Sequence, residues 1–240
     1  MTHSPSLLRL FLVLSLALLC LGMEDNQGCV ASESSEAVDQ DRIHTSYWLY
    51  YDAEGDTTYG RAQFRLGNGL GTPLLLADGA SVAFEGRLLG FDAVLDWYDA
   101  PRAGFFDGGD FVYMDLDGDT FVNTAPPLAP VEVPVDFPAT LRRDGSSLEV
   151  AWEGAPLAVG ESLAAIVAHD PNRFVFRRWE TRLPGATSIV LTGDALRDLP
   201  TGATVLTLRR WWESAPAEAP GAGGVIRTTY SSREAAFVLE

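Results

Sequence analysis

Residues 58–66 read TYGRAQFRL, and their alternation decides the fold class. Polar and apolar side chains take opposite faces of an extended chain in the order Arg61, Ala62, Gln63, Phe64, Arg65, Leu66. Period-two alternation of this kind is typical of a half-buried antiparallel strand. The stretch therefore predicts a sheet with one face in a core and the other in solvent.

Turn residues punctuate the chain on both sides of this strand, as at Gly67-Asn68-Gly69, Asp78-Gly79 and Asp117-Gly118. Frequent short strands with glycine turns favour an all-β sandwich over alternating helices and strands. The prolines of TAPPLAP, residues 124–130, indicate a joint between two units. We therefore expect two tandem antiparallel β-sandwich domains, one over 44–124 and one over 128–240.

The second domain contains seven candidate strands, the number found in an immunoglobulin-like sandwich. They span residues 131–135, 148–152, 163–168, 174–179, 188–191, 205–210 and 235–239. Two stretches of this domain resemble parts of a known domain family. GSSLEVAWEGAP, residues 145–156, resembles the second strand of fibronectin type III domains, and LRDLPTGATVLTLRR, residues 196–210, resembles their L-x-x-L-x-P-G corner. The resemblance implies that Trp152 is a core residue and that Leu196, Leu199 and Pro200 form the corner.

The N-terminal region predicts export. An apolar run over 7–21, broken by Arg9 and Ser15, is too short for a membrane span and is typical of a signal segment over 1–28. Gly28 before Cys29 resembles the lipidation site of bacterial lipoproteins, and ordinary cleavage is the alternative. Residues 29–43 are acidic and serine-rich, which predicts a flexible tether. The whole chain resembles two-domain exported bacterial lipoproteins, which implies the outer membrane or cell surface.

The net charge of the chain limits the classes of partner that it can bind. The 240-residue chain carries a net charge of −16, and all 17 of its cations are arginines. Because phosphate binding needs clustered cations, we expect no nucleic acid partner, and membrane contact only through the lipid anchor. The absence of lysine excludes Schiff-base chemistry and a Walker phosphate loop.

One segment has the spacing of a calcium loop. In MDLDGDTFVN, residues 114–123, Asp115, Asp117 and Asp119 occupy the first, third and fifth ligand positions. Thr120 replaces the glycine that an EF-hand needs, and Pro126 replaces its glutamate. We favour the alternative, an ordinary hairpin with a two-residue turn at Asp117-Gly118, which sends the carboxylates to opposite faces. Calcium is the one cofactor the sequence suggests.

Two segments of the second domain echo each other, FVFRRWETR at 174–182 and LTLRRWWES at 206–214. Alternation places Arg177 beside Trp179 and Arg209 beside Trp211, which predicts a stacking platform for a sugar or peptide. The alternative is an exposed face on which arginines stack for stability alone. A further acidic group, comprising Asp92, Asp96, Asp99, Asp107 and Asp110, predicts either a carboxylate patch or a solvated edge.

No catalytic residues stand out, because the chain has no G-x-S-x-G elbow and no cysteine beyond Cys29. The sequence therefore predicts a non-enzymatic extracytoplasmic binding or scaffolding module whose partner is a protein or glycan of the cell envelope or surface. A carbohydrate-binding protein is the first alternative. A carboxylate-dependent glycan hydrolase is the second.

Overall fold

The computed structural model describes residues 32–170 and 172–240, so the predicted signal segment and the predicted lipidation site Cys29 lie outside the described residues. The first half contains β1 (Glu33–Ser34), two 3-10 turns, η1 (Ser35–Ala37) and η2 (Gln40–Arg42), and then β2 (Ile43–Asp52), β3 (Thr57–Leu66), β4 (Leu74–Leu75), β5 (Ser81–Phe84), β6 (Arg87–Leu88), β7 (Gly90–Asp92), β8 (Trp97–Ala103), β9 (Gly109–Met114) and β10 (Thr120–Ala125).

The second half contains β11 (Val131–Glu132), β12 (Thr140–Leu141), β13 (Leu148–Ala151), β14 (Glu153–Gly154), β15 (Glu161–His169), β16 (Phe176–Thr181), β17 (Ser188–Leu191), α2 (Gly193–Arg197), β18 (Gly202–Ser214), β19 (Gly224–Ser231) and β20 (Ala235–Leu239). In the described ranges, no helix has the length and apolar character to cross a bilayer.

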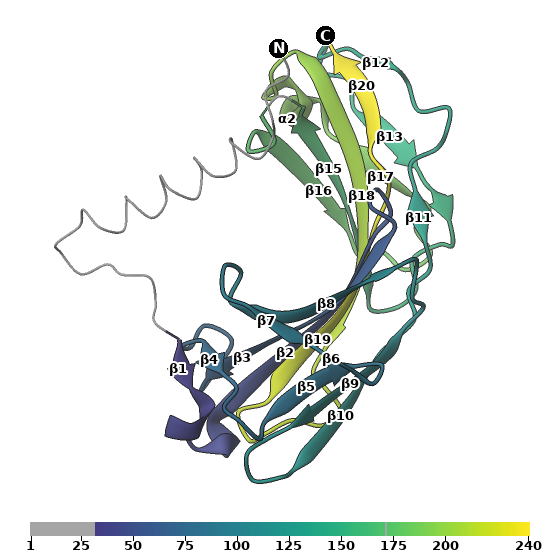
Figure 1. The fold of residues 1–240 in the computed structure, drawn as a ribbon. Helices are drawn as coiled ribbons and strands as arrows, with labels where there is room; N and C mark the ends of the chain where they lie inside the picture. Colours follow the sequence, from purple (N-terminus) through teal and green to yellow (C-terminus); the bar gives the residue numbers. More distant parts are fainter. Residues whose placement is uncertain (1–31, 171) are drawn as a thin grey trace, which may run out of the picture.

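One ten-stranded sheet runs through both halves of the molecule (Figure 1). Its order is β12-β20-β18-β19-β2-β3-β8-β7, and β15 and β16 extend it from the other edge of β18. β18 is 13 residues long, which lets it pair first with β20 and then with β19 along one edge. In Figure 1 the sheet curves, and β15 and β16 reach toward the same side as β7 and β8.

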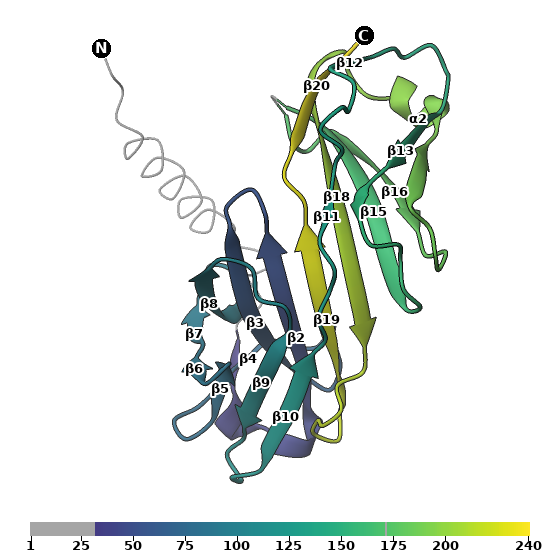
Figure 2. The same cartoon turned by 90° about the vertical axis from the view of Figure 1, so that its right-hand side faces the viewer.

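Smaller sheets pack on one side of the large sheet and enclose two cores (Figure 2). In the first half this second layer is β10-β9-β5-β6, and in the second half it is the pairs β13-β17 and β11-β14. Two sheets with their apolar faces in contact form a sandwich. The predicted all-β sandwich class is therefore confirmed.

The first core confirms the alternation from which the fold was predicted. Ala62 and Phe64 are 0% and 1% exposed. Gly60 lies under the ring of Phe84, where an added Cβ would be 2.7 Å from the ring carbons. That position needs glycine because any side chain would overlap Phe84.

The second core contains the residues that the fibronectin resemblance placed there. Trp152 is buried, with its Nε1 donating to the Ala155 carbonyl at 3.3 Å. Leu196 and Leu199 are also buried beside α2, where the corner was expected. All seven expected strands are present; β17 and β20 have the expected bounds, and the bounds of the other five are shifted.

Strands from both sides of the predicted domain boundary at 124–128 pair in one sheet. β19 lies in the range assigned to the second domain, yet it pairs in parallel with β2 over eight residues, from Gly224↔Thr45 to Ser231↔Asp52. Ile226 of this strand belongs to the first core, and Tyr51 of β2 belongs to the second. The halves thus have separate cores and share one sheet. Whether either half folds alone stays a prediction.

The expected interdomain joint also differs from prediction. Ala125 and Leu128 are buried, and Thr228 of β19 donates its hydroxyl to the Pro126 carbonyl at 3.0 Å. Pro127 and Pro130 are exposed, as expected of a joint, but Ala125 packs in the first core and Leu128 packs in the second, so the segment is anchored at both cores.

The expected tether needs correction over 33–43. Ser35 is fully buried, and its carbonyl oxygen accepts a hydrogen bond from Gln40 Nε2 at 2.8 Å, so the segment is held in place. β1 pairs in parallel with β4, and Ser34 and Asp39 cap η1 and η2 with their side chains. Serine and aspartate act here as caps for short turns, which composition alone does not distinguish from disorder.

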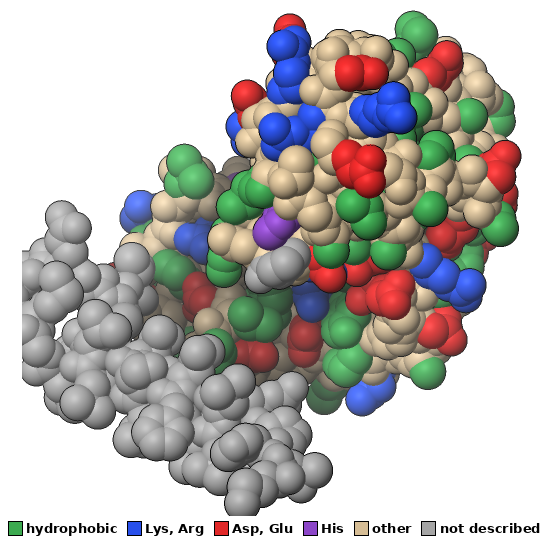
Figure 3. All heavy atoms as spheres, turned by 90° about the horizontal axis from the view of Figure 1, so that it is seen from above, with side chains coloured by type: hydrophobic (Ala, Val, Ile, Leu, Met, Phe, Trp, Pro, Cys, Tyr) green, Lys and Arg blue, Asp and Glu red, His purple; other side chains and the backbone are tan. Residues whose placement is uncertain are grey.

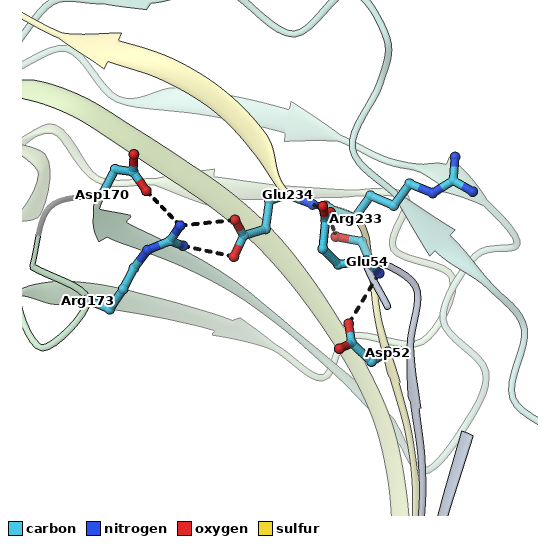
Figure 4. Close-up of polar contacts among 7 residues, drawn as sticks. Asp52, Glu54, Asp170, Arg173, Arg233 and Glu234 are labelled. Carbon is cyan, nitrogen blue, oxygen red and sulfur yellow. Dashed lines mark hydrogen bonds and ion pairs between the residues drawn. The ribbon is translucent and has the colours of Figure 1, made fainter. Parts of the chain in front are cut away.

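A polar network joins the halves where β2 ends (Figure 4). Arg173 pairs with Asp170 at 2.6 Å and with Glu234 at 2.8 Å. The Glu234 amide donates to Glu54 Oε2 at 3.2 Å, and Glu54 in turn donates its amide to Asp52. The acidic side chains elsewhere on the second half are spread among arginines and apolar groups in the view from above (Figure 3).

Candidate ligand-binding face

The face of the ten-stranded sheet that points away from both cores carries a band of arginine and aromatic side chains. We call it the concave face. Strand register aligns one row across β18, β19, β2, β3 and β8, comprising Glu213, Arg227, Trp48, Arg61 and Asp99. The next row runs from β15 to β8 and comprises Ser162, Trp211, Thr229, Tyr50, Tyr59 and Pro101. Residues in a row are about 4.8 Å apart, so they form one continuous surface.

Arg61 is the centre of the aromatic end of this face. Its guanidinium lies 4.5 Å from the ring centroids of both Tyr59 and Trp97 and 5.7 Å from that of Tyr50. Asp99 is 3.8 Å from its Nε. Stacking between aromatic rings fixes the planar group and partly dehydrates it.

The concave face is hollowed in two places. One hollow of about 330 Å³ lies over β16, β15 and β18, with Trp211, Arg178 and Glu180 in its wall. A second of about 470 Å³ lies over β2, β3 and β8, with Trp48 and Trp97 in its wall. Arg209, Arg227 and Thr229 line both hollows, so they are two parts of one depression. Each is large enough for a small ligand or part of a larger one.

Positive charge is concentrated in the two hollows, although the chain as a whole is acidic. Five arginines line the two hollows together with two glutamates; the arginines are Arg61, Arg178, Arg182, Arg209 and Arg227. Glu180 pairs with Arg178 at 3.1 Å and with Arg182 at 2.7 Å, and Glu213 pairs with Arg227. A locally basic depression in a chain of net charge −16 favours a ligand with negative charge.

Three hydrogen-bond donors on this face have no acceptor within the described residues. They are the Nε atoms of Arg61 and Arg209 and the Nε1 atom of Trp97, all withdrawn from solvent. A buried donor without a partner costs about 1–3 kcal/mol. Within the described part of the chain, aromatic stacking therefore holds these groups in place without supplying their acceptors.

The predicted platform residues separate onto two faces. Arg209 and Trp211 lie on the concave face, where Arg178 stacks 5.0 Å from the Trp211 ring. Trp179 faces the other way, packs against the second core and donates Nε1 to Thr192 Oγ1 at 3.0 Å. Arg177 pairs with Asp198 at 3.2 Å.

Register explains this separation. Ala165 of β15 pairs with Trp179 on one side and with inward-facing Leu208 on the other, so Trp179 shares the inward face. The two RRW motifs therefore differ by one residue in their register, so their equivalent side chains point to opposite faces of the sheet. The single platform expected from Arg177, Trp179, Arg209 and Trp211 is not formed, because only the second pair faces the depression.

The predicted calcium loop serves as a turn. Asp115 is 4% exposed, and its Oδ1 accepts from the amides of Asp117 at 3.0 Å and Asp119 at 2.9 Å. Met114 pairs with Thr120, so the loop spans residues 115–119 instead of the two-residue turn expected. Across the described ranges, no three His, Cys, Asp or Glu side chains are grouped as a metal site. The three aspartates are therefore not brought together as ligands.

The wider acidic group is dispersed. Asp92 Oδ1 accepts from the Val94 amide at 2.8 Å, Asp110 Oδ1 accepts from Thr124 Oγ1 at 2.6 Å, and Asp99 faces Arg61. These carboxylates act locally in turns and pairs.

Sequence reasoning missed Trp48, Tyr50 and Trp97 of the first half and Arg227 of β19. The outward alternation that marked Arg61 was the available signal. It could not reveal that β19 would place Arg227 beside Trp48, because parallel pairing between segments 180 residues apart leaves no local pattern.

Comparisons with known proteins find only distant likeness. No family model matches the chain, and no curated protein matches it. Among solved structures, the FN1–FN3 domains of chicken CNTN1 align with a TM-score of 0.27 and 9% identity, over 80% of this chain and 65% of that one. A 1.5-MDa bacterial ice-binding adhesin aligns with a TM-score of 0.26 and 10% identity, over 82% of this chain and 64% of that one.

A tetra-tandem repeat from the extending region of a large adhesion protein aligns with a TM-score of 0.24 and 12% identity, over 81% of this chain and 49% of that one. The chain thus spans less than two thirds of the length of each of these structures. Its assignment as a β-sandwich protein rests on its own sheets and cores.

Proposed function

We propose that this protein is a non-enzymatic binding module of the cell envelope or surface, exported and tethered through Cys29, that holds its ligand on the concave face. The observation that carries the proposal is the continuous arginine and aromatic surface that β18, β19, β2 and β3 build jointly from both halves. Neither half supplies this surface alone, so the shared sheet has a use beyond stability.

The unpartnered donors support binding over a purely structural role. If arginine and aromatic stacking served stability alone, the Nε atoms of Arg61 and Arg209 would be expected to find acceptors in the sheet. A glycan is the favoured ligand over a protein, because ion pairs line the depression, whereas the cores of protein interfaces are depleted of charge.

Catalysis has less support. Glu180 and Glu213 are the carboxylates in the hollow over β18, and both are engaged by arginines. Glycoside hydrolysis needs one carboxylic acid that donates a proton to the leaving oxygen. Both carboxylates are instead held in ion pairs with arginines, so the depression fits binding better than hydrolysis.

A pull-down from native envelopes tests the proposal. The mature chain is compared with Trp211→Ala and Arg61→Gln, which alter the two ends of the concave face, and with Arg177→Gln, which alters an exposed arginine on the opposite face. We expect captured material to be lost with the first two variants and retained with the third. Capture that is equal for all four proteins would contradict the proposal.

A further inference from the structure

The five arginines of the depression differ in one respect. Arg61, Arg178, Arg182 and Arg227 each have a carboxylate within 4 Å. The guanidinium of Arg209 makes no hydrogen bond or ion pair with any described residue, and its Nε is withdrawn from solvent. It lies at the centre of the depression, because it lines both hollows.

The surroundings of Arg209 hold its guanidinium without neutralising it. Its group lies 6.0 Å from the Tyr50 ring centroid, and β15 and β19 flank it with Ala164 and Ser231, which are small and carry no charge. A guanidinium presents a planar fork of donors that matches a carboxylate in two parallel hydrogen bonds. The unpaired guanidinium of Arg209 therefore fits one carboxylate.

Neighbouring groups specify what carries that carboxylate. Trp211 lies two residues along the same strand, and Tyr50 lies in the adjoining row, so aromatic rings flank the anion position. Aromatic faces beside hydroxyl and guanidinium donors suit a sugar ring, which offers an apolar face and a rim of acceptors. Thr229 adds a hydroxyl between the two hollows.

Charge limits the ligand to a low density of anions. One arginine is free of carboxylate partners in the depression, and the chain carries −16 overall. A polymer with a charge on every unit, such as a nucleic acid, meets long-range repulsion that one free guanidinium does not offset. A glycan with a single acidic sugar at the site does not meet this repulsion.

We propose that the concave face recognises a carboxylate-bearing sugar within a glycan, with the carboxylate held by Arg209 and the ring stacked near Trp211 and Tyr50. This inference rests on the proposed binding function of that face. It assigns to Arg209 the part of ligand recognition that depends on charge.

A glycan array with paired members tests it. The array holds oligosaccharides with a uronic or sialic acid, each beside its carboxyl-reduced counterpart, and a dT oligonucleotide and a polyglutamate peptide as other anions. We expect the mature chain to bind at least one acidic glycan about ten-fold or more tightly than its reduced counterpart, since a charge-assisted pair is lost.

Variants locate the effect. Arg209→Gln should lower the affinity for the acidic member about ten-fold and leave that for the reduced member unchanged, and Arg209→Lys should restore part of it because it keeps the charge but not the fork. Arg177→Gln, with the same change in charge on the opposite face, should bind as the unmodified chain does. Near-ultraviolet circular dichroism checks that each variant is folded.

The outcomes separate the inference from the proposed function. Equal binding of acidic and reduced glycans, lost with Trp211→Ala, would overturn the carboxylate inference and leave glycan binding on the concave face intact. Preference for the oligonucleotide or the peptide would overturn the choice of a sugar. Absence of glycan binding together with unaltered envelope capture by the Trp211→Ala variant would overturn both.

Discussion

Replacement of Ile226 by alanine tests whether β19 completes the first half of the molecule. Ile226 is 2% exposed and pairs with Tyr47 of β2 in the first core, although it lies more than 90 residues beyond the last strand of that half. Three buried carbons are lost, worth about 2.4 kcal/mol at about 0.8 kcal/mol each. A residual cavity adds to this, so we expect unfolding to become easier by about 3 kcal/mol.

Urea unfolding of the protein measures the loss of stability, and hydrogen exchange locates it. Exchange should accelerate most in β2 and β3, because local opening follows the weakened core. Val225→Ala is the matched control, since Val225 is the adjacent residue of the same strand and faces away from the core; its cost should stay below about 1 kcal/mol. The reasoning is refuted if both variants lose the same stability, or if faster exchange is confined to β13 and β17.

Four further predictions concern buried or capped groups and the predicted calcium loop. Arg210→Met removes a guanidinium that is 1% exposed and pairs with Glu161, so the stranded carboxylate should cost about 3–5 kcal/mol in urea unfolding; a cost under 1 kcal/mol would argue against a buried pair. Asp115→Ala should cost about 1–3 kcal/mol, because two loop amides lose their acceptor. Calcium should leave the melting temperature unchanged, whereas a bound ion at 100 Kd would add about 2.7 kcal/mol. Burial, with Arg65 as a second cause, lowers the pKa of His44 below its usual value of 6.5, so stability should be full above pH 6.5 and decline as the pH falls through the lowered value. His44→Gln should flatten this decline in melting curves taken from pH 7 to 4.

Because the halves share one sheet, a proteolytic cut between them should not separate them. A cut between β10 and β11 leaves β19 paired with β2 over eight residues, so the fragments should remain associated until denaturant is added. The buried Ala125 and Leu128 should make that cut slow. Exposed loops are better targets, because their backbone is not held by neighbouring strands.

The sequence by itself determined the fold class and most of the second core. Alternation around Phe64 gave the inward and outward faces of β3, since side chains on a strand alternate whatever its neighbours are. The corner at Leu196 and Leu199 and the buried Trp152 were also readable, because they are local patterns of apolar residues and turns. Local composition also gave the wrong prediction of a flexible tether over residues 33–43, because the polar side chains there cap short turns.

Only the tertiary structure decided how strands combine and which side chains meet. Arg177 and Trp179 carry the same motif as Arg209 and Trp211, yet register with β15 turns one pair inward and the other toward the depression. Likewise, the parallel pairing of β19 with β2 unites Arg227 with Trp48. A shift of one residue in register reverses every side chain of a strand, and register is set by non-local hydrogen bonds and core packing. For that reason the face of each strand could be predicted in isolation, and the concave face could not.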